Sequence, residues 1–93
     1  MVKKKTMVVL RAMFRDIKGI KDARDFDGSD GIHLGNCAEG GTIDGVAACD
    51  YYADDPEEGT YIMGVHKKLY KALSDMGWHA ECYDPVTYIA YQS

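Results

Sequence analysis

The chain has 93 residues, of which 46% are hydrophobic and 28% are charged, and its formal net charge is −4 at pH 7. These values predict one compact domain over residues 1–93, and no internal repeat or low-complexity tract interrupts it. The apolar run at residues 7–10 is too short for a membrane span or a signal-peptide core, so we expect a cytoplasmic protein that does not bind membranes.

The first half of the chain shows alternating apolar runs separated by turn residues. Residues 6–15 alternate well enough to predict a strand, and residues 16–31 predict a long loop because they are charged, glycine-rich and aperiodic. A second strand is expected from Gly31 to Leu34. Residues 42–53 fit a strand, a hairpin turning at Asp44 and Gly45, or a short helix. We take the strand as the working prediction.

Residues 56–76 predict one amphipathic helix. Asp55 is a suitable N-cap, Pro56 has the backbone geometry of a first helical residue, and Gly77 is suited to follow the last turn. Apolar side chains recur at three- and four-residue steps, with lysines between them, which indicates one buried stripe. The interior Gly59 indicates that the helix could begin nearer Thr60.

The period changes to two after Gly77, which predicts a hairpin with its turn at residues 84–87. An even-length turn pairs residue 82 with 89 and 80 with 91, which leaves Tyr83 and Tyr88 on the open face. Packing the helix on the other face gives an α+β fold: a small, mainly antiparallel sheet in the order β-β-β-α-β-β, with one helix on one face.

Motifs that carry chemistry are weak in this sequence. Residues 35–42 resemble a phosphate loop but place Gly41 where the lysine belongs, and residues 25–36 lack the glutamate of a calcium loop. No paired Cys-x-x-Cys or His-x-x-x-His anchors a zinc site, and three cysteines cannot all pair within one chain. We therefore expect reduced, structural thiols at Cys37, Cys49 and Cys82, and neither metal nor cofactor.

Charge is strongly segregated along the chain. Residues 1–24 carry eight Lys or Arg against two Asp (+6), residues 25–60 carry ten acids and no base (−10), and residues 61–93 balance at three each. The acidic middle repels nucleic acid and steers the chain toward a basic protein surface, and nearby tyrosines offer rigid contact area. The expected partner-binding residues are Asp44, Asp50, Tyr51, Tyr52, Asp54, Asp55, Glu57, Glu58, Tyr61, Tyr83 and Tyr88.

These features predict a non-catalytic protein that docks on, and inhibits, a nucleic-acid-handling partner, in the manner of the small acidic viral inhibitors that phages make against host defence. Two alternatives stay open. One is a nucleic-acid-binding module that uses the basic residues 3–24. The other is a small enzyme or ligand-binding protein built around His33, Cys37 and Asp44, for which no nucleophile, base and orienting group can be grouped from the sequence.

Overall fold

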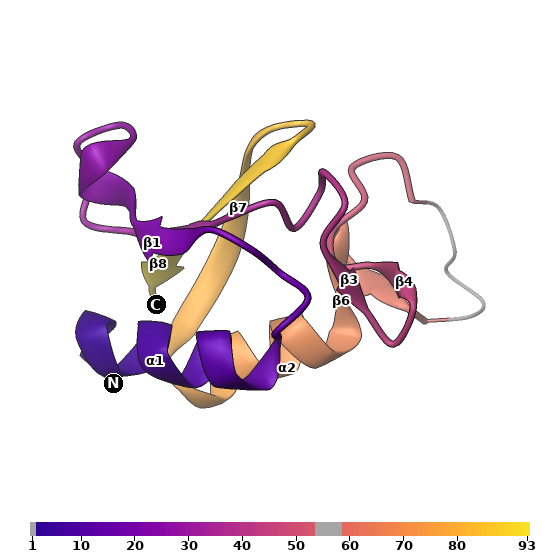
Figure 1. Ribbon diagram of the computed structural model, residues 1–93, viewed down its shortest axis with the longest axis horizontal. Coiled ribbons are helices and arrows are strands. Elements are labelled where there is room, and N and C mark those ends of the chain that lie inside the picture. Colours follow the sequence, from indigo (N-terminus) through magenta and orange to yellow (C-terminus); the bar gives the residue numbers. More distant parts are fainter. Residues whose placement is uncertain (1, 54–58) are drawn as a thin grey trace.

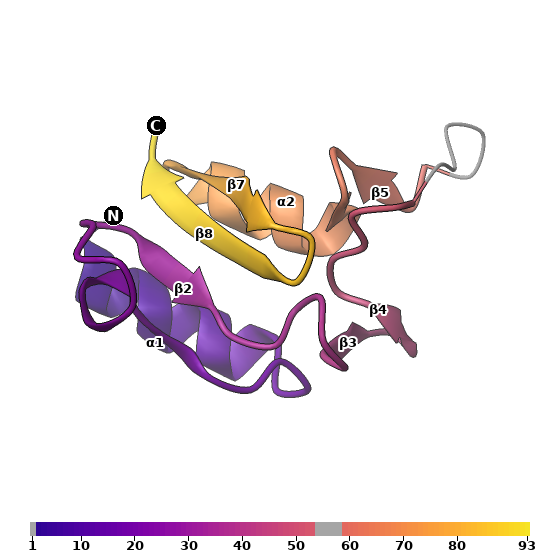
Figure 2. The same cartoon turned by 90° about the horizontal axis from the view of Figure 1, so that it is seen from above.

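The computed structural model describes residues 2–53 and 59–93, and it shows two helices on the same side of an antiparallel sheet (Figures 1 and 2). The helices are α1 (Lys3–Met13) and α2 (Lys67–Asp75). The four strands lie in the order β1 (Ile20–Asp22), β2 (Ile32–Leu34), β8 (Thr87–Gln92) and β7 (Trp78–Asp84). The expected α+β class with a mainly antiparallel sheet is confirmed at this level. The expected element order, with a single helix, is wrong.

The face of the sheet toward the helices forms the core. Ile32 pairs with Ala90, and Ala90 pairs with Ala80, so these residues share one face because directly paired residues project to the same side. Ile32 and Ala90 are completely buried and belong to the same cluster as Leu10 of α1 and Leu69 of α2. One core therefore joins both helices to the sheet.

Residues 6–15, expected as a strand, form most of α1. Thr6, Leu10 and Phe14 are buried and recur every four residues, which is the spacing of one helical face. The Thr6 hydroxyl donates to the Val2 carbonyl oxygen at 3.0 Å, so its polar atom is satisfied inside the core. Alternation and helical spacing both fit this run of apolar residues, and packing against the sheet selects the helix.

The second helix is shorter than the sequence predicts, because it begins at Lys67. His66 is its N-cap, since Nδ1 of the ring accepts a hydrogen bond from the backbone amide of Lys68 at 3.1 Å. The expected start at Asp55 and Pro56 lies outside the described residues. The apolar stripe of Leu69, Ala72 and Leu73 and the positive φ of Gly77 at the end of the helix are confirmed.

The hairpin of β7 and β8 forms with a changed register. Asp84 pairs with Thr87 as expected, but an irregularity between Cys82 and Asp84 then shifts the ladder, so that Cys82 pairs with Tyr88. This shift turns Tyr88 toward the core instead of the open face. Ile89 now projects to the opposite face, where it pairs with Glu81.

The remaining strands form two small hairpins at one end of the molecule (Figures 1 and 2). They are β3 (Thr42–Ile43) with β4 (Val46–Ala47), and β5 (Tyr61–Ile62) with β6 (Val65–His66). The single strand expected over residues 42–53 is wrong, and the alternative hairpin at Asp44 and Gly45 is correct. The expected loop over residues 16–31 also contains β1 and a 3₁₀ turn at Ala23–Asp25. No helix of the described chain is long and apolar enough to cross a membrane.

Candidate functional site

The two small hairpins have the same turn. Ile43-Asp44-Gly45-Val46 and Ile62-Met63-Gly64-Val65 share the pattern Ile-x-Gly-Val, and both central residues of each turn have positive φ, as type I′ hairpins require. The segment between the hairpins joins them. The amide of Asp50 donates to the Gly64 carbonyl oxygen at 2.8 Å, and the amide of His66 donates to the Ala48 carbonyl oxygen at 2.9 Å.

Exposed apolar side chains gather around the second hairpin and the segment bound to it. Met63 and Tyr52 expose 88% and 79% of their surface, Tyr51 exposes 52% and Ile62 exposes 39%. The rings of Tyr51 and Tyr52 meet edge to face with centroids 5.1 Å apart, which fixes their relative orientation. We call Tyr51, Tyr52, Ile62 and Met63 the hairpin-end surface. The bond between Asp50 and Gly64 brings their backbone segments together, and aromatic residues and methionine are enriched at protein interfaces.

Sequence reasoning identified the two tyrosines of this surface but not Ile62 or Met63. The helix predicted over residues 56–76 placed Ile62 in a buried stripe, because its spacing from Val65 and Leu69 fits a helix. The repeated Ile-x-Gly-Val pattern was the available signal, since Asp44-Gly45 already suggested a hairpin turn. A second occurrence with Met63 in place of Asp44 predicts a second hairpin.

The expected acidic residues divide into three groups. Asp44 forms an exposed ion pair with Lys68, and the hydrogen bond from this lysine, aided by its charge, lowers the pKa of the Asp44 carboxyl. Asp50 accepts the backbone amide hydrogen of Tyr52 at 3.0 Å and so stabilises the turn at Tyr51 and Tyr52, called the tyrosine turn below. The other four lie outside the described residues: Asp54, Asp55, Glu57 and Glu58.

The other expected tyrosines have different roles in the fold. Tyr61 is half-buried and its hydroxyl donates to the Ala47 carbonyl oxygen at 2.7 Å, which links the two hairpins. Tyr83 is exposed, and its ring meets the edge of Phe26 on the face of the sheet away from the helices. Tyr88 is 99% buried, and burial raises the pKa of its hydroxyl. The placement of Tyr88 on an open docking face is therefore corrected.

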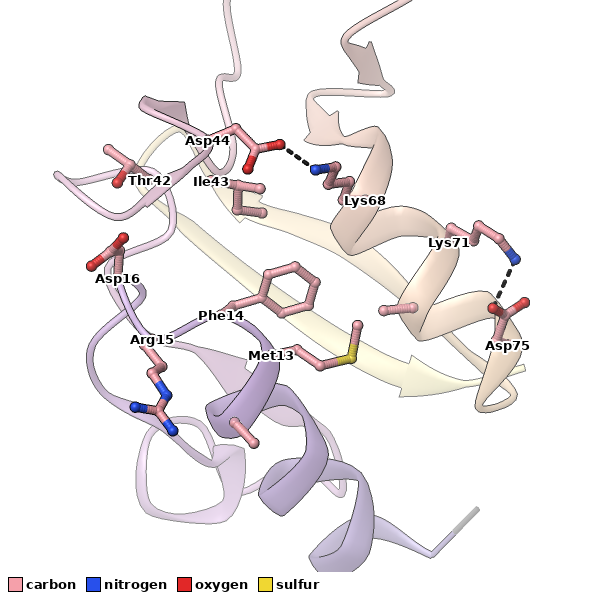
Figure 3. A pocket seen from close by; sticks show the side chains of 12 residues that line it. Met13, Phe14, Arg15, Asp16, Thr42, Ile43, Asp44, Lys68, Lys71 and Asp75 are labelled. Carbon is pink, nitrogen blue, oxygen red and sulfur yellow. Dashed lines mark hydrogen bonds and ion pairs between the residues drawn. The ribbon is translucent and has the colours of Figure 1, made fainter.

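An open groove of about 550 Å³ lies between the end of α1, the β3–β4 hairpin and α2 (Figure 3). Met13 at the end of α1 and Phe14 just after it point into the groove, whereas Arg15 points away. Ile43 and Ala72 complete its apolar wall. The Lys68–Asp44 and Lys71–Asp75 ion pairs follow its rim on the α2 side. No histidine or cysteine lines the groove. Its chemistry suits an apolar group bordered by hydrogen bonds.

Comparison with protein-family models, with curated proteins and with solved structures gave no match. Function is therefore argued from the residues themselves. Among residues 2–53 and 59–93, no three His, Cys, Asp or Glu side chains are grouped to hold a metal ion.

The residues considered for a small catalytic site have different surroundings in the structure. Cys37 is completely buried in the main core, and Asp44 lies at the turn of the first hairpin, paired with Lys68. His33 lies in β2, packs against Phe26 at 4.7 Å between ring centroids, and accepts the Gly35 amide hydrogen at Nδ1. Its pKa is lowered because burial disfavours the charged ring. Each of these groups has a structural partner of its own.

Proposed function

We propose that this protein is a non-catalytic binding protein whose hairpin-end surface docks on a basic protein surface. The partner we infer is a nucleic-acid-handling protein, which is inhibited when its phosphate-binding surface is occupied. The observation that carries the proposal is Met63, which has a positive φ of 53° and is almost fully exposed.

Met63 occupies a backbone conformation that costs free energy for a residue with a Cβ atom. Asp, Asn and Gly tolerate this conformation, and the equivalent position of the first hairpin is Asp44, with the same φ. With 88% of its surface exposed, Met63 has little packing inside the protein to offset that cost. Exposed methionine adapts its shape to different apolar surfaces, so a contact with a partner accounts for the choice.

The acidic sequence that follows Tyr51 and Tyr52 supports a basic partner. Asp50 lies at the base of the tyrosine turn, and the sequence that follows Tyr51 and Tyr52 holds four acids within residues 54–58. Carboxylates around an apolar contact speed the encounter with a positively charged protein and repel nucleic acid. The expected result is a fast, salt-sensitive association followed by apolar docking.

The contacts of the basic N-terminal segment favour this proposal over direct nucleic-acid binding. Lys3 forms ion pairs with Asp22 and Asp30, with Nζ to Oδ2 of Asp22 at 3.1 Å. The guanidinium of Arg11 donates to the Ile20 carbonyl oxygen, and Arg24 pairs with Asp30. These cations stabilise the fold around β1, which leaves fewer of them to meet phosphates.

The proposal is tested by capture from nuclease-treated host lysate with four immobilised proteins. These are the wild type, Met63→Asn, a variant with Asp54, Asp55, Glu57 and Glu58 changed to Asn or Gln, and a variant with Lys3, Lys4 and Lys5 changed to Gln. The specific partner is a protein retained by the wild type and the lysine variant and lost from the other two. With that partner purified, Met63→Asn should raise the dissociation rate, and the acid variant should lower the association rate in a salt-dependent way.

Met63→Asn is a matched variant because asparagine suits the turn, so its loss of binding cannot come from unfolding. Its melting temperature should equal or exceed that of the wild type. Retention of all proteins by Met63→Asn would refute the docking surface. Binding of labelled DNA with a steep salt slope, abolished by the three lysine changes, would instead establish the nucleic-acid module.

A further inference from the structure

The four-stranded sheet has one capped edge and one open edge. The capped edge is β1, which is three residues long and whose Ile20 carbonyl oxygen accepts two hydrogen bonds from the Arg11 guanidinium, at 3.0 and 2.7 Å. The other edge is β7, which is seven residues long and has no further strand beside it in the described chain. A long exposed edge is a template for pairing with another strand.

The hydrogen-bond phase of β7 determines which backbone groups face outward. The amide of Ser93 donates to the Gly77 carbonyl oxygen at 2.9 Å, so these residues form a hydrogen-bonded pair. Such pairs alternate along an antiparallel ladder, so His79 and Glu81 exchange bonds with β8. The amide and carbonyl groups of Ala80 therefore point away from β8, toward the open side.

We propose that β7 pairs with β7 of a second copy of this chain, antiparallel and around a two-fold axis at Ala80. In this register Ala80 exchanges both hydrogen bonds with Ala80 of the second copy, and His79 lies opposite Glu81 of the second copy. The contact is isologous, as expected for a two-fold dimer. It joins two four-stranded sheets into one continuous sheet.

Charge and phase together select this register. Within one chain, Nε2 of His79 lies 2.7 Å from Oε2 of Glu81, so the ring and the carboxylate are complementary partners. An axis at either residue would set identical side chains opposite each other. It would also need the backbone groups of His79 or Glu81, which already bond with β8, to face the second copy. An axis at Trp78 or Cys82 keeps the phase but shortens the ladder and removes the opposite-charge pairs. Opposite charges in directly facing positions stabilise a pair of strands, and like charges destabilise it.

The surroundings of Ala80 suit the approach of a second strand. Ala80 is small, and together with Tyr70 and Ser74 of α2 it lines a small depression of about 120 Å³. Tyr70 is 39% exposed there. Pairing across the axis would bring the two depressions together and cover both tyrosines, which adds apolar contact to the backbone hydrogen bonds.

The test is sedimentation equilibrium of the full chain between about 1 μM and about 1 mM, the range in which a modest interface dimerises. The wild type should show a monomer–dimer equilibrium. Ala80→Pro removes the axial amide hydrogen but leaves the β8 ladder intact, because proline is tolerated where the amide faces away from the neighbouring strand. Its dimer Kd should rise about tenfold or more, whereas Ala80→Ser should keep the wild-type value.

Charge reversal checks the register without relying on proline. Glu81→Lys should weaken the dimer because it removes the carboxylate that faces His79 of the second copy. The double variant His79→Glu with Glu81→Lys restores opposite charges in both positions and should recover the affinity. A wild type that stays monomeric over the whole range, or a folded Ala80→Pro variant that dimerises normally, would overturn the proposal. So would a double variant that binds no better than Glu81→Lys.

Discussion

The carbonyl oxygen of Cys37 accepts the backbone amide hydrogen of Cys49 at 2.8 Å inside the core. Both side chains are almost completely buried, whereas Cys82 is exposed. The neighbouring Cys37 thiol, followed by burial, raises the pKa of the Cys49 thiol. The three cysteines therefore differ in reactivity.

We predict that a thiol reagent labels Cys82 rapidly in the folded protein and labels the other two only after unfolding, because thiolates react and burial disfavours them. Mass spectrometry after timed alkylation measures this. Cys82→Ser should lose the rapid phase alone. Rapid double labelling of Cys82→Ser under native conditions would contradict this expectation.

The raised pKa of the Cys49 thiol also predicts a change of stability with pH. The stability that Cys49 contributes is present below about pH 8.5 and is lost as the pH rises above that value.

The second prediction concerns Leu69, which is completely buried between α2 and the sheet. Leu69→Ala should lower the free energy of unfolding by about 2–5 kcal/mol, since it removes apolar contacts and leaves a cavity. Urea denaturation followed by circular dichroism measures the change. Lys71→Ala, on the exposed side of the same helix, should cost less than about 1 kcal/mol because its ion pair with Asp75 is solvated. Equal effects of the two substitutions would show that Leu69 does not pack in the core.

The third prediction compares two glycines with positive φ. A Cβ atom on Gly35 would lie 2.0 Å from the Lys18 carbonyl oxygen, whereas one on Gly28 would meet nothing within 4 Å. Gly28→Ala should cost about 1 kcal/mol, from backbone strain alone. Gly35→Ala should cost clearly more, because the chain beside β1 must also move. Thermal unfolding ranks the two, and a ranking in the opposite order would be inconsistent with the close approach of residues 18 and 35.

The fourth prediction is a pH dependence that originates at His66. Its pKa is lowered mainly by burial, and the neutral ring accepts the amide hydrogen of Lys68 at the start of α2. The unfolded chain then binds more protons near pH 6, so the stability contributed by His66 is present above about pH 6.5 and is lost as the pH falls. His33 has a pKa lowered by the same cause and adds to this slope.

Denaturant titrations between pH 5 and pH 8 measure this slope. His66→Asn keeps an acceptor at the N-cap but removes the titration, so its stability should vary less with pH than that of the wild type. An unchanged slope in His66→Asn would show that the imidazole of His66 is not responsible.

The success of sequence reasoning here followed the strength of local signals. The stripe through Leu69 and Leu73 and the turn at Asp84 were predicted correctly, because a helical period and a turn residue act over a few positions. Residues 6–15 were not, since their apolar pattern fits both periods and only tertiary packing decides. Tyr88 was predicted on the wrong face because one irregularity in β7 shifts every later pair of the ladder. No residue type in the sequence indicates that irregularity.

The candidate docking site was foreseen only in part for a similar reason. Tyr51 and Tyr52 stood out beside the acidic stretch, but the role of Met63 depends on its backbone angle, which a sequence does not display. The role of the acids at residues 54–58 in docking remains a prediction.

The central position of β8 has a consequence for biosynthesis. β1 and β2 pair with each other and are made early, yet the second neighbour of β2 is β8, at residues 87–92. Until that strand leaves the ribosome, the sheet that buries Ile32 and Leu34 lacks β8 and β7. Folding of the sheet is therefore a late event that closes a long segment of chain at once, a topology that slows folding and favours assistance from a chaperone during translation.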